Sequence, residues 1–168
     1  MSTNDTVVAL ASGASGVRPD QDAFTTALAQ VCHSLAQQLL TDAEGSAHDI
    51  SITVKGAASE ADALEVARSI ARNNLFKCAI FGNDPNWGRV LAALGTTSAA
   101  YDPADLDVFF NGVEVYHAGA IGADRSLVDL TPRACDVVVD LHVAKASATI
   151  HTNDLTYDYV KENAEYSS

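Results

Sequence analysis

The segment DISITVKGAASEADALEVARSIARN, residues 49–73, carries the pattern that decides the fold. In its first part Ile50, Ile52 and Val54 alternate with polar residues, which is typical of a strand with one buried face. Ser59 then opens a second pattern, in which apolar residues recur at steps of three and four along an amphipathic helix. The segment therefore predicts a strand followed directly by a helix.

A longer helical pattern precedes this unit, over residues 20–42. Pro19 and Asp20 stand where such a helix would begin. Glu44 and Gly45 follow its end, where glycine can take the left-handed conformation, so we expect Glu44 on a turn. The apolar positions that define the stripe of this helix are Phe24, Ala27, Leu28, Val31, Leu35 and Leu39.

The first residues of the chain do not supply a strand that is clearly recognisable. Residues 6–12 form an apolar run closed by Gly13, which fits either a short capped helix or a buried strand. The chain before Glu44 therefore offers helices but no certain partner for the sheet. We expect residues 1–43 to belong to a neighbouring domain and residues 44–168 to form an α/β domain.

The next run of apolar residues, 75–81, is suited to a strand buried on both faces. Residues 82–85, with the sequence GNDP, follow it and are expected to start a helix that ends at Gly95. The sequence thus predicts a second strand, a tight loop and a helix in direct succession.

A hairpin is predicted further along the chain. Asn111 and Gly112 accommodate a positive φ at both centres of a type I′ turn, and residues 107–110 and 113–116 on either side are rich in apolar and aromatic residues.

Two further strands are predicted at residues 137–143 and 148–152, paired antiparallel through a short connection at Lys145. Asn153 and Asp154 can cap a final helix. The complete order predicts an α+β fold: a mixed sheet of five to six strands covered by helices, with an N-terminal helical segment over residues 1–43.

The composition of the 168 residues is typical of a globular domain, with 48% apolar and 19% charged side chains. The formal net charge of −12 argues against nucleic acid and anionic membrane surfaces as partners. No apolar run approaches the roughly 20 residues of a membrane span, and no secretory signal is recognisable. These features predict a cytoplasmic protein, and its three separate cysteines predict no disulfide framework.

Few motifs point to chemistry. The sequence has no GxSxG elbow, no P-loop and no dinucleotide fingerprint. The GNDPNWGR segment, residues 82–89, either holds an anion on free backbone N–H groups or serves only as a turn and helix start. Glu44 can accept hydrogen bonds from a substrate ammonium group, although most such glutamates are merely solvated. No HxxxH or HxH pair occurs, so no metal site is predicted among the histidines, which are His33, His48, His117, His142 and His151.

Several segments taken together resemble the ornithine acetyltransferase family, the glutamate N-acetyltransferases of arginine biosynthesis. The resemblance covers the whole chain, and the GNDPNWGR block is its most distinctive part. The segments are STNDT at 2–6, EGS at 44–46, AIFGNDPNWGRVLAALG at 79–95 and DLTYDYVKENAEYSS at 154–168.

The resemblance implies a specific reaction and assembly. Members of the family move an acetyl group from N-acetylornithine to glutamate, and some also take it from acetyl-CoA. Their precursor cuts itself before a threonine, which becomes the nucleophile of the β chain, and two αβ pairs form a heterotetramer. No cofactor or metal takes part. This chain resembles the C-terminal part of the β chain and lacks the Ala-Thr-Met-Leu junction.

The resemblance also implies which residues bind substrate. Glu44 matches the glutamate that receives the amino group of the substrate, and Asn163 and Ser168 match an asparagine and a C-terminal residue that enclose it. Residues 1–43 would then be a helical remnant of the nucleophile-bearing domain. No catalytic residue is expected in the chain, which should be inactive alone and should require the α chain and the remaining β-chain segment. The alternative is a free-standing, non-enzymatic module that binds an amino acid or a protein.

Overall fold

The computed structural model describes residues 6–165 and divides the chain into two compact units, residues 1–36 and 37–168. Helix α1 (Gln21–Thr41) confirms the long helical pattern and continues from the first unit into the second. Residues 6–12 form neither a helix nor a strand, so both interpretations of that apolar run were wrong. Within the described residues, no helix combines the length and apolar character that a membrane span requires.

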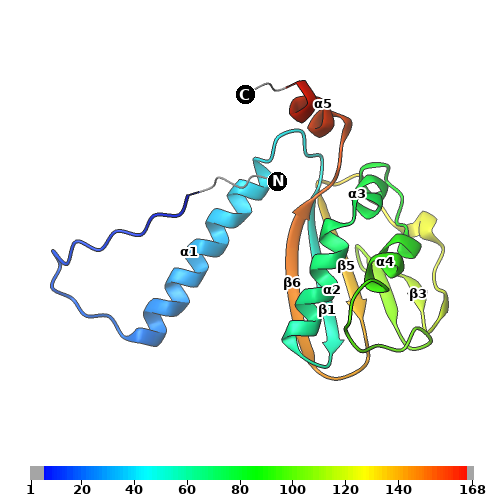
Figure 1. The fold of residues 1–168 in the computed structure, drawn as a ribbon, viewed down its shortest axis with the longest axis horizontal. Helices are drawn as coiled ribbons and strands as arrows, with labels where there is room; N and C mark the ends of the chain where they lie inside the picture. The colour runs from blue at the N-terminus through cyan, green and yellow to red at the C-terminus, as the bar shows by residue number, and fades with distance from the viewer. Residues whose placement is uncertain (1–5, 166–168) are drawn as a thin grey trace. The chain divides into compact units, whose positions relative to one another are not determined.

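The second unit is built on a six-stranded mixed sheet, in the order β4-β3-β2-β5-β1-β6 (Figure 1). The interior strand β1 runs parallel to β5 and antiparallel to the edge strand β6, and the remaining pairs are antiparallel. The predicted α+β fold class is thereby confirmed. The strands are β1 (Asp49–Ala57), β2 (Asp107–Phe110), β3 (Val113–His117), β4 (Ala120–Ile121), β5 (Ala134–Asp140) and β6 (Ala146–Asn153).

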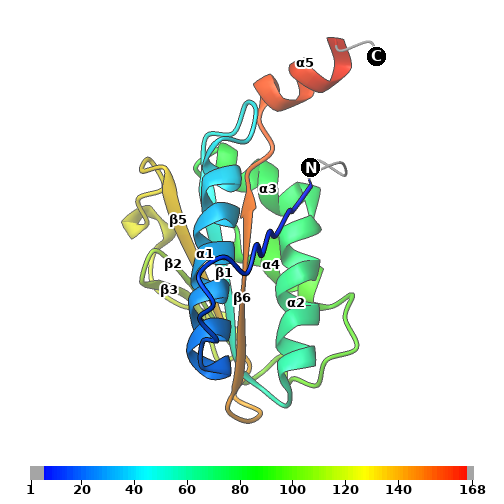
Figure 2. The ribbon, with the colours of Figure 1, turned by 90° about the vertical axis from the view of Figure 1, so that its left-hand side faces the viewer.

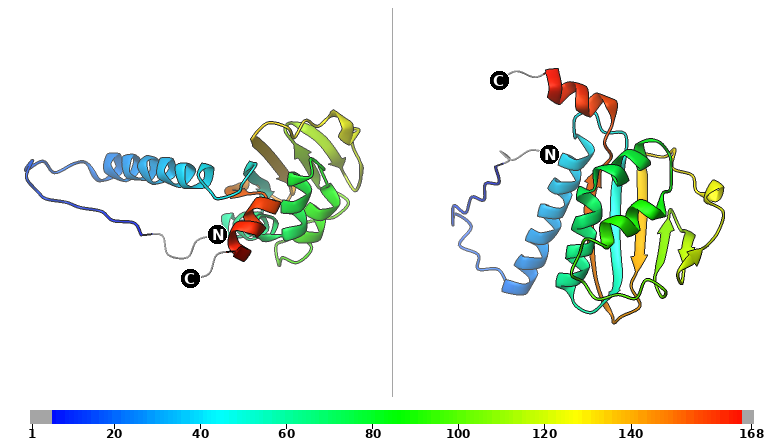
Figure 3. Two further views of the ribbon diagram at one scale, coloured as in Figure 1. Left: turned by 90° about the horizontal axis from the view of Figure 1, so that it is seen from above. Right: turned by 45° about the vertical axis from the view of Figure 1, so that its right-hand side comes forward.

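Three helices, α2 (Glu60–Arg72), α3 (Asn74–Phe81) and α4 (Trp87–Leu94), cover one face of this sheet (Figure 3). The alternation in β1 is confirmed, because Ile50, Ile52 and Val54 are buried beneath the helices while intervening residues are not. A short 3₁₀ helix, η1 (Arg125–Leu127), lies between β4 and β5. The largest fully buried side chains are Phe76, Phe110, Ile50, Ile52, Ile70, Ile80, Leu94, Leu106, Leu130, Leu141, Val54 and Val66.

The strand predicted at residues 75–81 was wrong, because these residues form helix α3. Asn73 caps that helix, and its side-chain oxygen accepts a hydrogen bond from the Phe76 N–H at 3.0 Å. Phe76, Ala79 and Ile80 are buried, at the spacing of one helical face. A short apolar run cannot by itself distinguish a buried strand from a buried helix.

The predicted pairing of the last two strands was also wrong. Both strands exist, but β1 lies between β5 and β6, so they do not pair with each other. Their connection passes the end of β1, where the N–H groups of Val143 and Ala144 both donate to the Gly56 carbonyl. Strand β1 satisfies hydrogen bonds along both its edges in this arrangement.

Turn and cap residues were predicted with mixed success. The hairpin is confirmed, with φ angles of 45° at Asn111 and 81° at Gly112. Helix α4 begins at Trp87, later than the predicted start at residues 82–85, and Asn86 caps it. Helix α5 (Tyr157–Glu165) is confirmed, but Thr156 occupies its capping position.

The environments of the three cysteines predict different reactivities. Burial raises the pKa of the Cys135 thiol to about 12, and the charges of Asp136 and Asp154 add to the effect. Cys32 and Cys78 are exposed. Treatment of the native protein with iodoacetamide at about pH 8 should therefore label Cys32 and Cys78 and leave Cys135 unmodified, as peptide mass spectrometry would show. Equal labelling at Cys135 would contradict this prediction.

Candidate functional site

The turn between α1 and β1 carries the first predicted site residue. Glu44 is exposed there, and Gly45 beside it has a φ of 66°, which favours glycine. The Ser46 N–H closes the turn by donating to the Ala43 carbonyl at 3.2 Å. The prediction that Glu44 lies on a turn is thus confirmed, and its carboxylate is accessible to a ligand.

Asp154 holds the end of this turn in place through hydrogen bonds. It lies between β6 and α5, only 3% exposed. One carboxylate oxygen accepts hydrogen bonds from the N–H groups of Ala47 and His48 at 3.0 and 3.1 Å, and the other lies 2.6 Å from His48 Nδ1. The sequence suggested that Asp154 caps a helix, but the structure uses it to join two segments that are far apart in the chain.

His48 extends the connection toward β5. Its Nε2 atom donates to the Leu130 carbonyl at 2.8 Å. Because Nε2 carries a proton, Nδ1 can approach the Asp154 carboxyl group at 2.6 Å only if a proton lies between these two atoms. The buried pair therefore holds the turn through hydrogen bonds at both ring nitrogens.

Arg133 and Asn153 secure the end of α1, where carbonyl groups lack helical partners. Arg133 donates to the Thr41 carbonyl at 2.6 Å and contacts the Asp49 carboxylate through two nitrogens, each at 3.1 Å. The Asn153 amide donates to the carbonyls of Leu40 and His48, both at 3.1 Å. Both ends of the turn are consequently held by side chains at the start of β5 and the end of β6.

The first turn of α5 is attached to the same region. The Thr156 hydroxyl donates to the Gly45 carbonyl and accepts from the Tyr159 N–H at 3.0 Å. Phe81 of α3 meets Tyr157 edge to face, with ring centroids 5.3 Å apart. Figure 2 shows α5 following β6 at the end of the sheet where the turn enters β1.

The other two predicted residues differ in what the structure describes of them. Asn163 is exposed on α5, and its amide donates to the Tyr159 carbonyl at 2.8 Å. Ser168 lies outside the described residues. The structure therefore connects the Glu44 turn with the helix that carries Asn163, and it leaves the Asn163 side-chain oxygen as an acceptor.

Lys77 is a further residue of this region that the sequence analysis missed. Burial lowers the pKa of this half-buried lysine, against the opposing influence of the Asp154 charge. Its carbonyl accepts from the Leu155 N–H at 3.4 Å, so α3 borders the segment that leads into α5. Lys77 lies in this region because residues 75–81 form a helix rather than the predicted strand.

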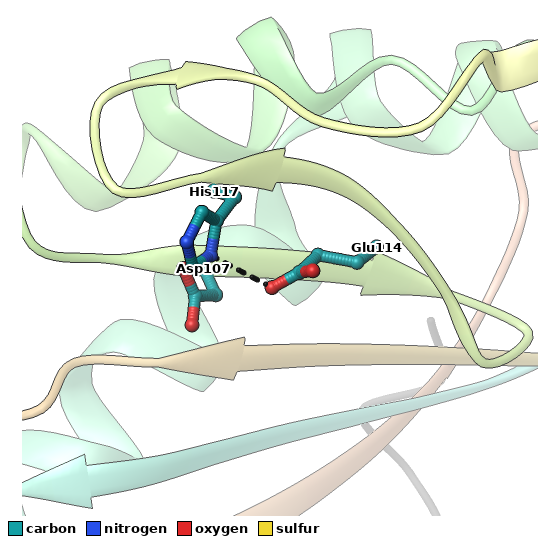
Figure 4. Close-up of side chains that lie close together, drawn as sticks. All are labelled: Asp107, Glu114 and His117. Carbon is teal, nitrogen blue, oxygen red and sulfur yellow. Dashed lines mark hydrogen bonds and ion pairs between the residues drawn. The ribbon is translucent and has the colours of Figure 1, made fainter.

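A separate cluster of ionisable side chains lies on the β2–β3 hairpin (Figure 4). The Nδ1 atom of His117 lies 2.9 Å from Asp107 Oδ1 and 3.0 Å from Glu114 Oε1. His142 Nε2 contacts the second oxygen of Asp107 at 2.7 Å. The ligand atoms of Asp107, Glu114 and His117 all lie within 4.8 Å of one another, so these residues could hold a metal ion.

The mutual hydrogen bonds shift the pKa values in this cluster. Burial would raise the pKa of Asp107, but hydrogen bonds from His142 and the Ala118 N–H, with the nearby imidazole charges, hold it below its usual value. The hydrogen bond to Asp107 raises the pKa of His142. Glu114, by hydrogen bond and charge, raises the pKa of His117, and Asp107 adds to this effect.

These shifts predict a pH window for the variant Asp107→Asn. Because folding lowers the pKa of Asp107, its carboxylate stabilises the fold at pH values above its ordinary pKa of 3.8. Because folding raises the pKa values of the histidines, their imidazoles stabilise the fold at pH values below their ordinary pKa of 6.5. Both contributions to stability are fully present between pH 3.8 and pH 6.5. The stability lost on substitution should be largest there and smaller at both extremes, as urea unfolding at about pH 3, 5.5 and 8 would measure. A loss that is constant across this range would contradict the prediction.

The GNDPNWGR segment serves the architecture through most of its side chains. Asn86 caps α4 and donates to Asp84 at 2.9 Å, and Arg89 donates to the Leu75 carbonyl of α3. The Trp87 ring stacks at a tilt on Tyr116 with centroids 4.8 Å apart. These contacts favour the interpretation as a turn and helix start.

Comparisons with known proteins agree with one another. A family model described as the ArgJ family matches residues 1–168. The chain is 60% identical over 168 residues to the arginine biosynthesis bifunctional protein ArgJ of Streptomyces avermitilis, and 58% identical over 168 residues to that of Streptomyces coelicolor. Each match covers 100% of this chain and 44% of the relative, so the chain spans less than half the length of these proteins.

A solved structure shows the same fold. The crystal structure of the arginine biosynthesis bifunctional protein from Bacillus halodurans matches with a TM-score of 0.88 and 32% sequence identity. The match covers 99% of this chain and 83% of that chain.

Proposed function

Because this chain belongs to the ArgJ family, we propose that it is the C-terminal part of the β chain of a cytoplasmic acetyltransferase of arginine biosynthesis. The complete enzyme would move an acetyl group from N-acetylornithine to glutamate. This chain would line part of the amino-acid pocket, and the nucleophilic threonine would lie in the part of the protein that precedes it.

The observation that carries this proposal is the placement of Glu44. Its carboxylate is exposed on a turn that the side chains of Asp154, Arg133 and Asn153 hold at both ends. An anionic oxygen on a turn held in this way suits the ammonium group of an amino acid, which N-acetylornithine carries on its side chain and glutamate on its α-carbon. Asn163, on the attached helix, would supply a neutral amide to the same substrate, and we extend this role to Ser168.

The proposed mechanism divides the work between this chain and the rest of the enzyme. The threonine attacks the acetyl carbonyl of N-acetylornithine, and the nitrogen of ornithine leaves with a proton. Glutamate then takes the acetyl group from the acyl-threonine in a second step. Glu44 would bind the side-chain ammonium group of N-acetylornithine in the first step. In the second step it would hold the α-amino group of glutamate, which must lose its proton before it attacks, and the threonine oxygen would regain a proton when the acetyl group leaves it.

The exposed face of α1 supports the need for a partner. The stripe residues Phe24, Leu28, Val31, Leu35 and Leu39 are 47–63% exposed. A helix with such a stripe usually buries it, so we propose that this face packs against the remaining part of the protein in a heterotetramer of two αβ pairs.

A chimeric precursor tests the function. This chain would replace the corresponding C-terminal part of the Streptomyces avermitilis relative, and acetyl transfer from N-acetylornithine to glutamate would be measured, with acetyl-CoA as a second donor. We expect the chimera to be active and the separate 168-residue chain to be inactive. Activity of the separate chain would overturn the assignment of the nucleophile, and an inactive, folded chimera would favour the non-enzymatic module.

The same chimera tests Glu44. Loss of a charge-assisted hydrogen bond of about 1.5–3 kcal/mol predicts that Glu44→Gln raises KM for glutamate roughly 10- to 150-fold. Asp42→Asn, a matched change on the same turn, should leave KM within about twofold of its original value. Equal KM values for both variants would show that Glu44 does not bind the substrate.

A further inference from the structure

The β2–β3 hairpin brings Asp107, Glu114 and His117 onto one face of the sheet by means of a bulge. In a regular strand, residues three apart point to opposite faces, as Glu114 and His117 would. Phe109 pairs with Glu114 and Val108 pairs with Tyr116, so β3 has one extra residue between these pairs. The extra residue turns His117 to the side of Glu114, and bulges of this kind often re-aim side chains next to functional sites.

The separations within the cluster suit a metal ion as well as hydrogen bonds. Ligand atoms that bind zinc tetrahedrally at about 2.0–2.2 Å lie about 3.3–3.6 Å apart, so the cluster would have to open by about half an ångström around the ion. His117 Nδ1 lies 2.9 and 3.0 Å from the nearest oxygens of Asp107 and Glu114. Imidazole and carboxylate ligands suit Zn²⁺ and related divalent ions, and the two carboxylates would balance the charge of the ion.

Asp107 is held in a way that would support this role. It is the buried member of the group, with its side chain 10% exposed, whereas the His117 side chain is 62% exposed. His142 holds its Oδ2 atom at 2.7 Å, and the Ala118 N–H donates to Oδ1 at 3.1 Å. A second residue that orients a ligating carboxylate is a common feature of protein metal sites.

We propose that Asp107, Glu114 and His117 form a binding site for a divalent transition-metal ion, with Zn²⁺ as the representative ion and His142 orienting Asp107. The site is distinct from the substrate region. Asp107 pairs with Asp140, which pairs with Lys55 near the end of β1, whereas the Glu44 turn enters β1 at its beginning. The two sites therefore lie at opposite ends of the central strands. One open side of the ion would remain for water or a further ligand.

Isothermal titration of the 168-residue protein with ZnCl₂ tests the proposal, with circular dichroism as the check of folding. We expect one ion per chain and an affinity at least tenfold weaker in both His117→Ala and Glu114→Gln. His151→Ala, which removes an exposed histidine on β6, should bind as the unaltered protein does. The second variant keeps the test decisive if the first fails to fold.

Other outcomes would overturn the site. No saturable binding by the unaltered protein would exclude it. Equal affinity in the unaltered protein and the two ligand variants would place the zinc elsewhere. Titration with CoCl₂ provides a separate check, because visible absorption bands that disappear in Glu114→Gln would identify this carboxylate as a ligand of the bound ion.

Discussion

Replacement of Asp154 by alanine is expected to lower the free energy of unfolding by about 3–5 kcal/mol. The substitution removes the acceptor of the Ala47 and His48 N–H groups and the partner of His48 Nδ1, and both His48 and Asp154 are buried. Buried donors without an acceptor cost about 1–3 kcal/mol each. Urea denaturation monitored by circular dichroism would measure the loss.

Asp158→Ala provides the control for this variant. Asp158 lies exposed on the first turn of α5, so its replacement should change stability by no more than about 0.5 kcal/mol. Hydrogen exchange adds a local measurement, because Asp154→Ala should increase exchange at the start of β1 and along α5. If the two variants were equally stable, the proposed role of Asp154 in joining these segments would be wrong.

Gly45→Ala is expected to detach α5 from the turn. A Cβ atom at this position would lie 2.8 Å from the Asp158 carbonyl carbon and closer still to the Tyr159 nitrogen. Both atoms belong to the backbone of α5, so no side-chain rotation relieves the collision. The positive φ of 66° adds about 1–2 kcal/mol of strain for a residue with a side chain. We expect a total loss above about 2 kcal/mol and faster hydrogen exchange throughout α5.

Gly112→Ala is the control for Gly45→Ala, because it introduces the same kind of backbone strain without a steric collision. Gly112 has a φ of 81°, but no atom lies within 4 Å of its hypothetical Cβ. Its replacement should therefore cost only the conformational strain and leave exchange in α5 unchanged. Unchanged exchange in α5 after the Gly45 substitution as well would show that the helix does not depend on this contact.

Two elements that the sequence predicted well, β1 and α2, have one face in the core and one outside. The alternation over Ile50, Ile52 and Val54 and the periodicity of α2 both reflect that difference. Residues 75–81 lacked such a contrast, and only the capping asparagine at position 73 indicated a helix. The pairing of β5 and β6 failed for another reason, since the insertion of β1 between them depends on contacts across the whole chain.

The candidate sites likewise differ in how much of each the local sequence could predict. Gly45 marked the turn that carries Glu44, because a left-handed glycine after a helix is a local signal. The role of Asp154 could not be read locally, since an aspartate after a strand and before a helix is also a good cap. The sequence did not predict the cluster at Asp107 and His117, because a hairpin and a bulge, rather than a short motif, bring these residues together.

The strand order has a consequence for synthesis on the ribosome. Strand β1 ends at Ala57, but neither of its neighbours is available until residues 134–153 have been translated. At about 5–20 residues per second this delay lasts roughly 4 to 20 seconds. During that time an apolar strand has both edges unpaired, which favours capture by chaperones or association with other nascent chains. Slowing translation between β1 and β5 should therefore lower the soluble yield more than slowing it after β6.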